Sequence, residues 1–275
     1  MVNAVQTYAE SVGEFALGLA ILGRRRAFVS HEIMRRGGWG AVHPAAGFAG
    51  LVWHVARGVR PVVRAAGLEP WLTRLWRARH ATRGTTPATL QPRELRGATV
   101  GLIGWSANAR AFAARLQQAQ ARVLVYTEHA SDPDLGRSGV ARASLGEALA
   151  ANIVSLHRGL TPGTRHFLGA AELEKLRPGA VLINIARGAL VEPDALLARL
   201  RRGDVFACLD TYVTEPPVEG DPPRTLPNVF LTSHIAGGST DMQAAAAHEV
   251  VRKIADYLTG AAVEGISAER LRMMT

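Results

Sequence analysis

The chain has 275 residues, of which 48% are hydrophobic and 6% aromatic, so it is long enough to bury one large core or two small ones. Its single cysteine, Cys208, excludes a disulfide framework and favours a reducing, cytoplasmic location. No apolar run approaches the roughly 20 residues of a membrane span. The arginines at 24–26 follow the first apolar run, whereas the positive charges of a signal peptide precede its apolar run. We therefore expect a soluble protein.

The net charge of +9 lies entirely in the first third of the chain. Residues 1–96 hold 14 arginines and 5 glutamates, which gives +9, whereas residues 97–275 hold 18 basic and 18 acidic side chains, which gives zero. Arginine makes up 30 of the 32 basic residues, so codon bias explains part of this excess. The charge alone is therefore weak support for a nucleic-acid partner.

Residues 9–36 are predicted to form one long helix that ends at Gly37 and Gly38. Basic residues collect towards its end, where they complement the helix dipole. Apolar side chains recur at a spacing of three and four residues, namely Val12, Phe15, Leu19 and Leu22.

Residues 41–92 combine tryptophans with many arginines, and Pro61 and Pro70 divide them into short helical pieces. We interpret this segment as an amphipathic arm that packs on the domain or on a second subunit. Contact with a membrane surface or with nucleic acid is the less favoured alternative. The stretch from Thr82 to Pro92, rich in threonine, proline and glycine, is typical of a linker.

From Thr99 onward, apolar strand-like runs alternate with helical patterns. Runs without polar alternation indicate strands covered on both faces, so we predict an α/β fold: a doubly wound parallel sheet, Rossmann-like, with an N-terminal helical segment. The predicted strands are 99–103, 122–126, 153–156, 181–184, 205–209 and 229–231. The predicted helices are 109–118, 145–150, 170–176, 193–201 and 240–258. Domain boundaries are expected at 1–92, 93–245 and 246–275.

Three of the later segments each place an ionisable residue just after a strand-like run: Arg187, Glu215 and His234. In an open parallel sheet, ligands bind outside the carboxyl ends of the strands, where these residues are expected to meet. Arg187 can bind a carboxylate with two hydrogen bonds. His234 can exchange a proton near neutral pH, and Glu215 can hold the imidazole and favour its charged form. Taken singly, each of the three is more often structural than catalytic.

These segments resemble the D-isomer-specific 2-hydroxyacid dehydrogenase family, from about Leu95 to about Gly260. The resemblance implies hydride transfer between a nicotinamide cofactor and a small 2-oxo or 2-hydroxy acid, with Arg187, Glu215 and His234 as the catalytic residues. It also implies a homodimer and no metal. About a hundred residues of substrate domain precede the long helix in the family, against about eight here, which leaves open a start further upstream. Other matching segments are Leu95–Gly104, Ile153–His157, Leu160–Thr164 and Leu226–Val229.

The dinucleotide fingerprint of the family is incomplete in this chain. Gly104 supplies its first glycine, while Ser106 replaces the second and Ala109 the third. The Cβ of Ser106 occupies space that a pyrophosphate would approach, although its hydroxyl could donate a hydrogen bond and the helix start, with Ala107 and Asn108, would still favour an anion.

The ribose position is also altered. The resemblance places a carboxylate at the end of the second strand, but this position is Thr127, with Glu128 and His129 beside it. Glu128 can replace the carboxylate, which favours NAD, whereas His129 or a nearby arginine would tolerate the 2′-phosphate of NADP. The other cofactor positions that the resemblance implies are His157, Thr164, Ala186, Asp210 and Gly237.

The departures from the family pattern keep a second function open. A chain that retained the scaffold but lost fingerprint glycines and most of the substrate domain could be a catalytically impaired member that acts as a dinucleotide-binding or interaction protein. Asp210, which the resemblance places against the nicotinamide amide, has a strand-end cap as its alternative role.

Overall fold

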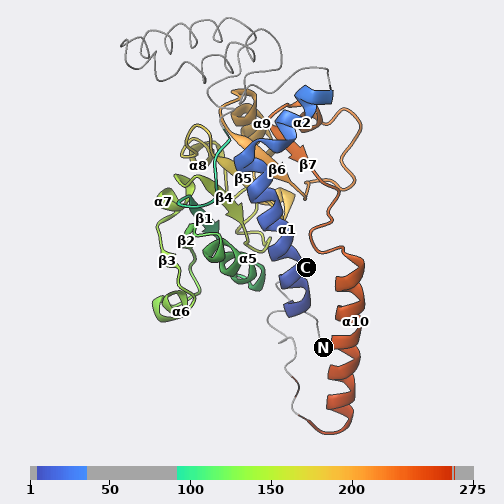
Figure 1. Cartoon of the computed structure of the whole chain (residues 1–275). Coiled ribbons are helices and arrows are strands. Elements are labelled where there is room, and N and C mark those ends of the chain that lie inside the picture. The colour runs from blue at the N-terminus through green and yellow to red at the C-terminus, as the bar shows by residue number, and fades with distance from the viewer. Residues whose placement is uncertain (1–4, 36–91, 262, 264–275) are drawn as a thin grey trace, which may run out of the picture. The chain divides into compact units, whose positions relative to one another are not determined.

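The structure, a computed structural model, describes residues 5–35, 92–261 and 263. The described residues form a seven-stranded, all-parallel sheet in the order β3-β2-β1-β4-β5-β6-β7 (Figure 1). This order confirms the prediction of a doubly wound α/β fold. The strands are β1 (Thr99–Ile103), β2 (Arg122–Tyr126), β3 (Ala141–Arg142), β4 (Ile153–Leu156), β5 (Val181–Asn184), β6 (Phe206–Leu209) and β7 (Val229–Leu231).

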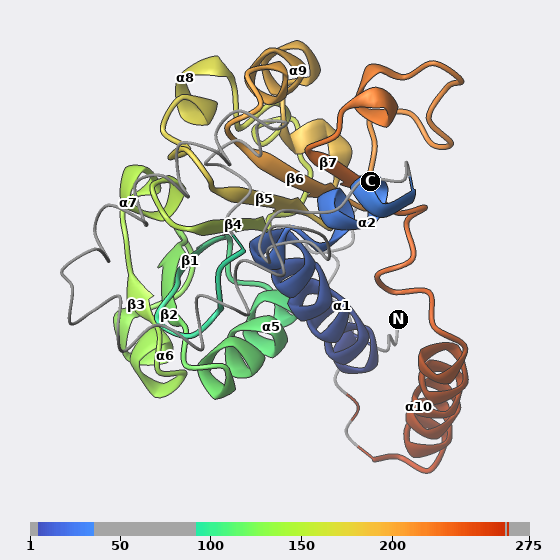
Figure 2. The ribbon, with the colours of Figure 1, turned by 45° about the horizontal axis from the view of Figure 1, so that its top comes forward.

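Helices cover both faces of the sheet (Figure 2). On one face lie α1 (Val5–Arg25) and α5 (Ala107–Gln118), and on the other lie α7 (Leu145–Leu149), α8 (Ala170–Leu173) and α9 (Pro193–Arg201). The short α6 (Asp132–Arg137) connects β2 to β3. Every residue of β4, β5 and β6 is buried, because these strands are covered from both sides.

The strands end in register across the sheet. Ile103 pairs with both Tyr126 and Leu156, so β1, β2 and β4 finish at the same level. Leu156 pairs with Asn184, Asn184 with Leu209, and Leu209 with Leu231, the last residue of β7. The loops that follow these strands therefore leave the sheet along one edge, where the candidate side chains were expected.

The single long helix predicted for residues 9–36 is wrong, because Arg26 divides it. The first helix, α1, ends at Arg25, and α2 (Ala27–Arg35) follows. Arg26 has a φ of +56° and a buried side chain, whose guanidinium lies 3.5 Å from the ring centre of Phe206 and donates to the carbonyl oxygens of Gly23 and Gly179. This anchoring to the sheet stops the helix, and it leaves no mark in the apolar periodicity. Gly37, Gly38 and the arm at 41–91 lie outside the described residues.

The remaining helices and strands follow the prediction closely. The expected strands are confirmed to within one residue, and the final helix, α10, spans Thr240–Leu258 as expected. The helix predicted for 170–176 ends at Leu173. Four short elements were missed: α6, β3 and the 3-10 helices η2 (Gly188–Leu190) and η3 (Pro222–Thr225). Contacts within the chain group residues 1–27 with 92–275 and set 28–91 apart. The expected division into 1–92, 93–245 and 246–275 stays a prediction. None of the helices in the described ranges combines the length and apolar character needed to cross a bilayer.

Substitution of two glycines of α1 tests how this helix packs on α5. A Cβ at Gly13 would lie 2.8 Å from the Cβ of Ala111 and 2.9 Å from that residue's carbonyl carbon, whereas a Cβ at Gly18 would have nothing within 4 Å. We expect Gly13→Ala to destabilise the protein by about 1–3 kcal/mol, because the helices must separate. Gly18→Ala should stabilise it by about 0.5–1 kcal/mol, since alanine favours the helix. Urea unfolding of both variants measures the difference, and equal stabilities would contradict this packing.

Candidate active site

Arg187 is held by a turn that Asn184, the last residue of β5, organises with its side chain. The Asn184 amide oxygen accepts the N–H of Ala186 at 3.2 Å, and its amide nitrogen donates to the carbonyl oxygen of Arg187 at 2.9 Å. The Arg187 side chain is exposed, and its Nη1 donates to the carbonyl oxygen of Ala186 at 2.7 Å. The turn therefore presents the guanidinium at the carboxyl edge of the sheet.

Glu215 follows β6 and bridges two groups with its two carboxylate oxygens. Its Oε1 accepts the main-chain N–H of Tyr212 at 2.9 Å, and its Oε2 lies 2.6 Å from Nδ1 of His234. Because Nδ1 faces the carboxylate, Nε2 of His234 is the nitrogen left to exchange a proton with a ligand. The structure thus brings Glu215 and His234 together as the sequence predicted, from loops after β6 and β7.

His234 has a φ of +56°, a left-handed conformation that a non-glycine residue adopts when its surroundings enforce it. The enforcing group is Asp210, which has no exposed surface. Its Oδ1 accepts the hydroxyl of Thr232 at 2.6 Å and the N–H of Ile235 at 2.9 Å, and its Oδ2 accepts the N–H of Ala236 at 2.9 Å. We call these contacts the Asp210 clamp. These hydrogen bonds hold the loop after β7 both before and after His234.

Helix α1 also holds this loop. The Ser11 hydroxyl donates to the carbonyl oxygen of Ala236 at 3.2 Å, and a Cβ at Gly237 would meet the ring of Tyr8 at 3.4 Å. Both oxygens of Asp210 are engaged within the protein, so its contact with a nicotinamide amide stays a prediction. The cofactor roles of Gly237 and Ala186 stay predictions too.

Arg187 lies beside the Glu215–His234 pair. A Cβ added at Gly188 would come within 2.1 Å of the carbonyl carbon of Tyr212, so the loops after β5 and β6 touch through their main chains. Burial on its own would raise the pKa of Glu215, but hydrogen bonds from His234 and from the Tyr212 N–H, together with the charges of His234 and Arg187, lower it below its usual value. The carboxylate is therefore ionised at neutral pH.

The other end of the site lies between β1 and β4, where the sheet order changes direction. Gly104 ends β1 with a φ of +103°, and a Cβ there would lie 2.8 Å from the carbonyl oxygen of His157, so only glycine suits this turn. Ser106 caps α5, with its hydroxyl accepting the N–H of Ala109 at 3.3 Å. The first N–H groups of α5, at Ala107 and Asn108, have no acceptor within the helix and suit an anion.

The end of β2 holds an ion pair where a ribose-binding carboxylate was expected. Glu128 accepts Nη1 and Nη2 of Arg158 at 3.3 and 2.7 Å, and the hydroxyl of Tyr126 at 2.9 Å. The hydrogen bond from Arg158 is the main cause that lowers the pKa of Glu128. Thr127 is buried, and its hydroxyl oxygen accepts the N–H of His129 at 3.3 Å. The acid at this edge is therefore Glu128, as the sequence allowed.

His157 and Thr164 are both buried and bonded within the protein. The Nε2 of His157 lies 2.9 Å from the hydroxyl oxygen of Ser155, and burial lowers the pKa of this histidine from about 6.5 to about 3, so it is neutral. The Thr164 hydroxyl donates to the carbonyl oxygen of Gly159 at 2.8 Å and closes the loop after β4. Their contacts with a cofactor stay predictions.

Three residues that organise the site were missed by the sequence analysis: Asn184, Tyr212 and Arg158. An asparagine three residues before Arg187 at the end of a strand is a signal for a side-chain-stabilised turn, and it could have been used. Tyr212 acts through its main chain and through a hydroxyl that donates to the carbonyl oxygen of Thr232 at 2.6 Å, which no motif indicates. Among the described residues, no cluster of three or more His, Cys, Asp or Glu side chains is arranged to hold a metal ion.

Comparison with known proteins identifies a family. Residues 66–236 match the profile described as D-isomer specific 2-hydroxyacid dehydrogenase, NAD binding domain. Glycerate dehydrogenase of Methylorubrum extorquens is 31% identical over 170 residues, which cover 61% of this chain and 52% of that protein. Glyoxylate reductase of Thermofilum pendens is 28% identical over 254 residues, covering 91% and 62%. The chain thus spans about half to three-fifths of these relatives' length.

Solved structures agree with the fold. A protein from Thermus thermophilus superposes with a TM-score of 0.68 at 27% identity, covering 94% of this chain and 68% of that one. The NAD-complexed D-isomer specific 2-hydroxyacid dehydrogenase of Lactobacillus delbrueckii ssp. bulgaricus superposes with a TM-score of 0.69 at 22% identity, covering 94% and 69%. The second likeness supports the fold alone.

His157 should make stability fall as the pH falls below about 6.5. Its pKa in the folded state is about 3, so between pH of about 6.5 and pH of about 3 the unfolded chain binds a proton at this residue that the folded protein does not bind. Between pH 7 and pH 5 this group should remove about 2 kcal/mol from the free energy of unfolding. His157→Gln should flatten the slope measured by urea unfolding across that range. An unchanged slope would mean that His157 is protonated in the folded state.

Asp210 should be a large contributor to stability. In Asp210→Ala the donors of the clamp lose their acceptor, which should cost about 3 kcal/mol. Asp210→Asn should cost less, because one amide oxygen can still accept the N–H of Ile235 and the hydroxyl of Thr232. Urea unfolding at pH 7 measures both variants. A loss of under about 0.5 kcal/mol in Asp210→Ala would show that water replaces the carboxylate and that the clamp does not hold the loop.

Proposed function

We infer the function from one premise: the chain belongs to the D-isomer specific 2-hydroxyacid dehydrogenase family, of which it contains the NAD-binding domain. We propose that it is an NAD-dependent oxidoreductase that interconverts a small 2-oxo acid and the matching 2-hydroxy acid. The observation that carries the proposal is the 2.6 Å contact between Nδ1 of His234 and Oε2 of Glu215, beside the exposed Arg187. Glycerate dehydrogenase and glyoxylate reductase are among its relatives, so glyoxylate and hydroxypyruvate are the first substrates to test.

Arg187 binds the substrate carboxylate in this proposal. A guanidinium presents two parallel N–H groups that match the two oxygens of a carboxylate. The turn organised by Asn184 fixes the main chain of Arg187, and the hydrogen bond from its Nη1 to the carbonyl oxygen of Ala186 holds the guanidinium. Fixing the carboxylate also fixes the adjacent carbonyl carbon, which is the atom that changes oxidation state.

His234 supplies the proton for reduction through Nε2, which donates to the carbonyl oxygen as charge develops there. Glu215 does not touch the substrate in this scheme. Its ionised carboxylate orients the imidazole and stabilises the imidazolium. In the reverse direction the neutral imidazole accepts the proton of the 2-hydroxyl group.

The residues between β1 and β4 suit a dinucleotide. NAD, when bound, supplies or accepts the hydride. The Gly104 turn and the first N–H groups of α5 would hold its diphosphate, and Glu128 would accept the ribose hydroxyl groups. Arg158 pairs with Glu128 and keeps NADP as the alternative, because a guanidinium can bind a 2′-phosphate.

We also propose that the chain forms a homodimer and acts in the cytoplasm. The dimer is supported by the family resemblance, and the location by the presence of one cysteine in 275 residues. The activity itself, like these two points, is proposed for a chain that covers only part of its relatives.

Turnover of glyoxylate, hydroxypyruvate and pyruvate with NADH tests the function. We expect Arg187→Ala to lower kcat/KM by about 10²–10⁴-fold and Arg187→Lys by less, since lysine keeps the charge but loses the fork. Glu215→Gln should lower kcat by about 10²-fold, because a neutral amide no longer stabilises the imidazolium.

Arg201→Lys is the matched control, because Arg201 lies exposed in α9, away from Arg187, and should leave the rates unchanged. Calorimetry with NADH and thermal unfolding show whether each variant is folded and binds cofactor. A folded wild-type protein that binds NADH without Arg187-dependent turnover would contradict the proposed reaction and favour the non-catalytic dinucleotide-binding protein.

A further inference from the structure

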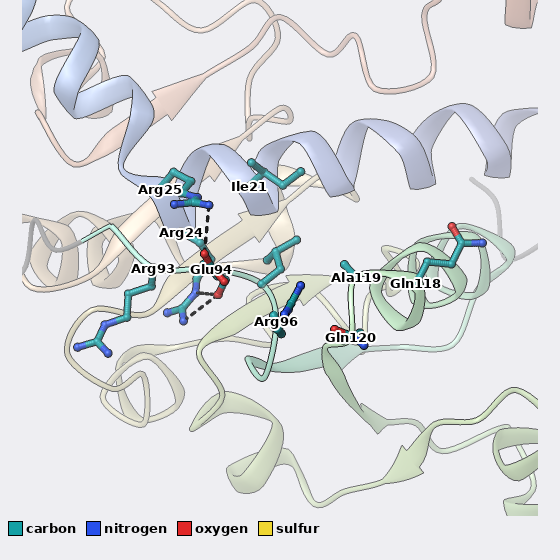
Figure 3. A pocket seen from close by; sticks show the side chains of 10 residues that line it. Ile21, Arg24, Arg25, Arg93, Glu94, Arg96, Gln118, Ala119 and Gln120 are labelled. Atoms are coloured by element: carbon teal, nitrogen blue, oxygen red, sulfur yellow. Dashed lines mark hydrogen bonds and ion pairs between the residues drawn. The ribbon is translucent and has the colours of Figure 1, made fainter.

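A hollow of about 410 Å³ lies at the edge of the sheet opposite the proposed active site, where β1 and β2 begin. Three segments enclose it: the last turn of α1, residues 93–96 before β1, and the turn 118–120 between α5 and β2 (Figure 3). The main chain ties two of these segments together, because Gly97 donates its N–H to the carbonyl oxygen of Gln120 at 2.9 Å. The walls thus belong to the folded core of the domain.

The charge of this hollow is strongly unbalanced. Three arginines, Arg24, Arg25 and Arg96, line it against one glutamate, Glu94, which gives these four residues a formal charge of +2. Arg93 also lines the hollow and interacts with a further group. Glu94 makes one long ion pair, 3.7 Å from Nη2 of Arg25, between two side chains that are both more than half exposed. An exposed pair of this kind neutralises little of the surrounding charge. The lining is therefore suited to an anion.

Arg24 is the buried member of the group. Its side chain donates from Nε and Nη2 to the carbonyl oxygen of Glu94, at 3.4 and 3.3 Å, and within the described part of the chain its partner is this carbonyl and not a carboxylate. Burial, followed by the charges of Arg93 and Arg177, lowers the pKa of Arg24. Neighbouring Arg26 has its pKa lowered to about 10, by burial and then by Arg24. The like charges therefore repel one another.

Stabilisation of a helix end does not account for this cluster. Arginines in the last turn of a helix interact well with its dipole, and Arg24 and Arg25 could serve that role in α1. Arg93 and Arg96 come from a separate segment that is not helical, and the charge of Arg93 opposes that of Arg24. A role at the helix end therefore does not explain why charges from both segments lie around one hollow, and an anionic ligand would lie favourably among them.

We propose that this hollow, the arginine pocket, binds a small multivalent phosphate-type anion such as a di- or triphosphate. Guanidinium groups bind phosphate oxygens in pairs, and those of Arg24, Arg25 and Arg96, reaching from two segments, can surround a diphosphate. The volume lies within the range of small-ligand sites. Arg24, held by the carbonyl of Glu94 at the base of the pocket, supplies a fixed donor group, while the exposed Arg25 and Arg96 can close on the ligand from the rim. This proposal is independent of the reaction at Arg187.

Calorimetric titration with inorganic pyrophosphate tests the arginine pocket. A titration with sodium chloride at equal ionic strength serves as the reference. We expect wild-type protein to bind and the double variant Arg25→Ala/Arg96→Ala to bind at least about tenfold more weakly, since it loses charge-assisted hydrogen bonds. Both positions are exposed, so the fold should survive, and thermal unfolding checks this. Arg201→Ala/Arg252→Ala removes the same charge at exposed positions in α9 and α10, outside the pocket, and should bind like the wild type.

Three results would overturn the proposal. The first is an absence of pyrophosphate binding to the wild-type protein. The second is equal binding to wild type and to Arg25→Ala/Arg96→Ala, which would place the anion elsewhere, including the N-terminus of α5. The third is equal weakening in the control, which would indicate attraction by net charge alone. Should the double variant unfold, Arg96→Gln alone provides the same comparison at one rim position.

Discussion

The position of His234 depends on the carboxylate of Asp210, which is fully buried. Asp210 stands at the end of β6, and its two oxygens accept from the loop after β7, on both sides of His234. The histidine is thereby fixed in a left-handed conformation that its own backbone preference disfavours. The hydrogen bond from His234 to Glu215 depends on this conformation, because it sets the direction of the imidazole. A fully buried acid thus positions an exposed proton donor.

The parallel sheet supplies the second condition. Because β5, β6 and β7 end in register, the loops carrying Arg187, Glu215 and His234 start from the same level and along one edge. Short-range contacts then refine their placement: Asn184 beneath Arg187, and Gly188 against the main chain of Tyr212. A few hydrogen bonds at loop bases are enough to bring together residues that lie 19 to 47 positions apart in the sequence.

Helices and strands that follow a repeating apolar pattern could be predicted from the sequence. Features that depend on contacts between distant segments could not. Strands such as β4 and β5 are mostly apolar and do not alternate with polar residues, so their burial on both faces could be deduced. Strand β3 is two exposed residues, Ala141 and Arg142, and two residues have no period to recognise. Arg26 ends α1 by reaching Gly179, 153 residues away, and nothing near Arg26 in the sequence encodes that contact.

The same division holds within the site. Arg187, Glu215 and His234 could be predicted as a group because their chemistry and order follow a family pattern, and the structure brings the last two into direct contact. The ion pair of Glu128 with Arg158 could not, because it joins residues 30 positions apart on different strand ends. Asp210 was predicted near the cofactor, yet its hydrogen bonds to the loop of His234 require knowing where that loop folds.

The Asp210 clamp also constrains how this loop can evolve. Two of its three donors, the N–H groups of Ile235 and Ala236, belong to the main chain, which every residue except proline provides. The clamp therefore does not restrict the side chain at the exposed position 235, whereas Ala236 is buried and is restricted by packing. Inserting or deleting one residue between Thr232 and Ala236 would instead shift every donor past the carboxylate. The clamp therefore restricts the length of this loop more strictly than the identity of its residues.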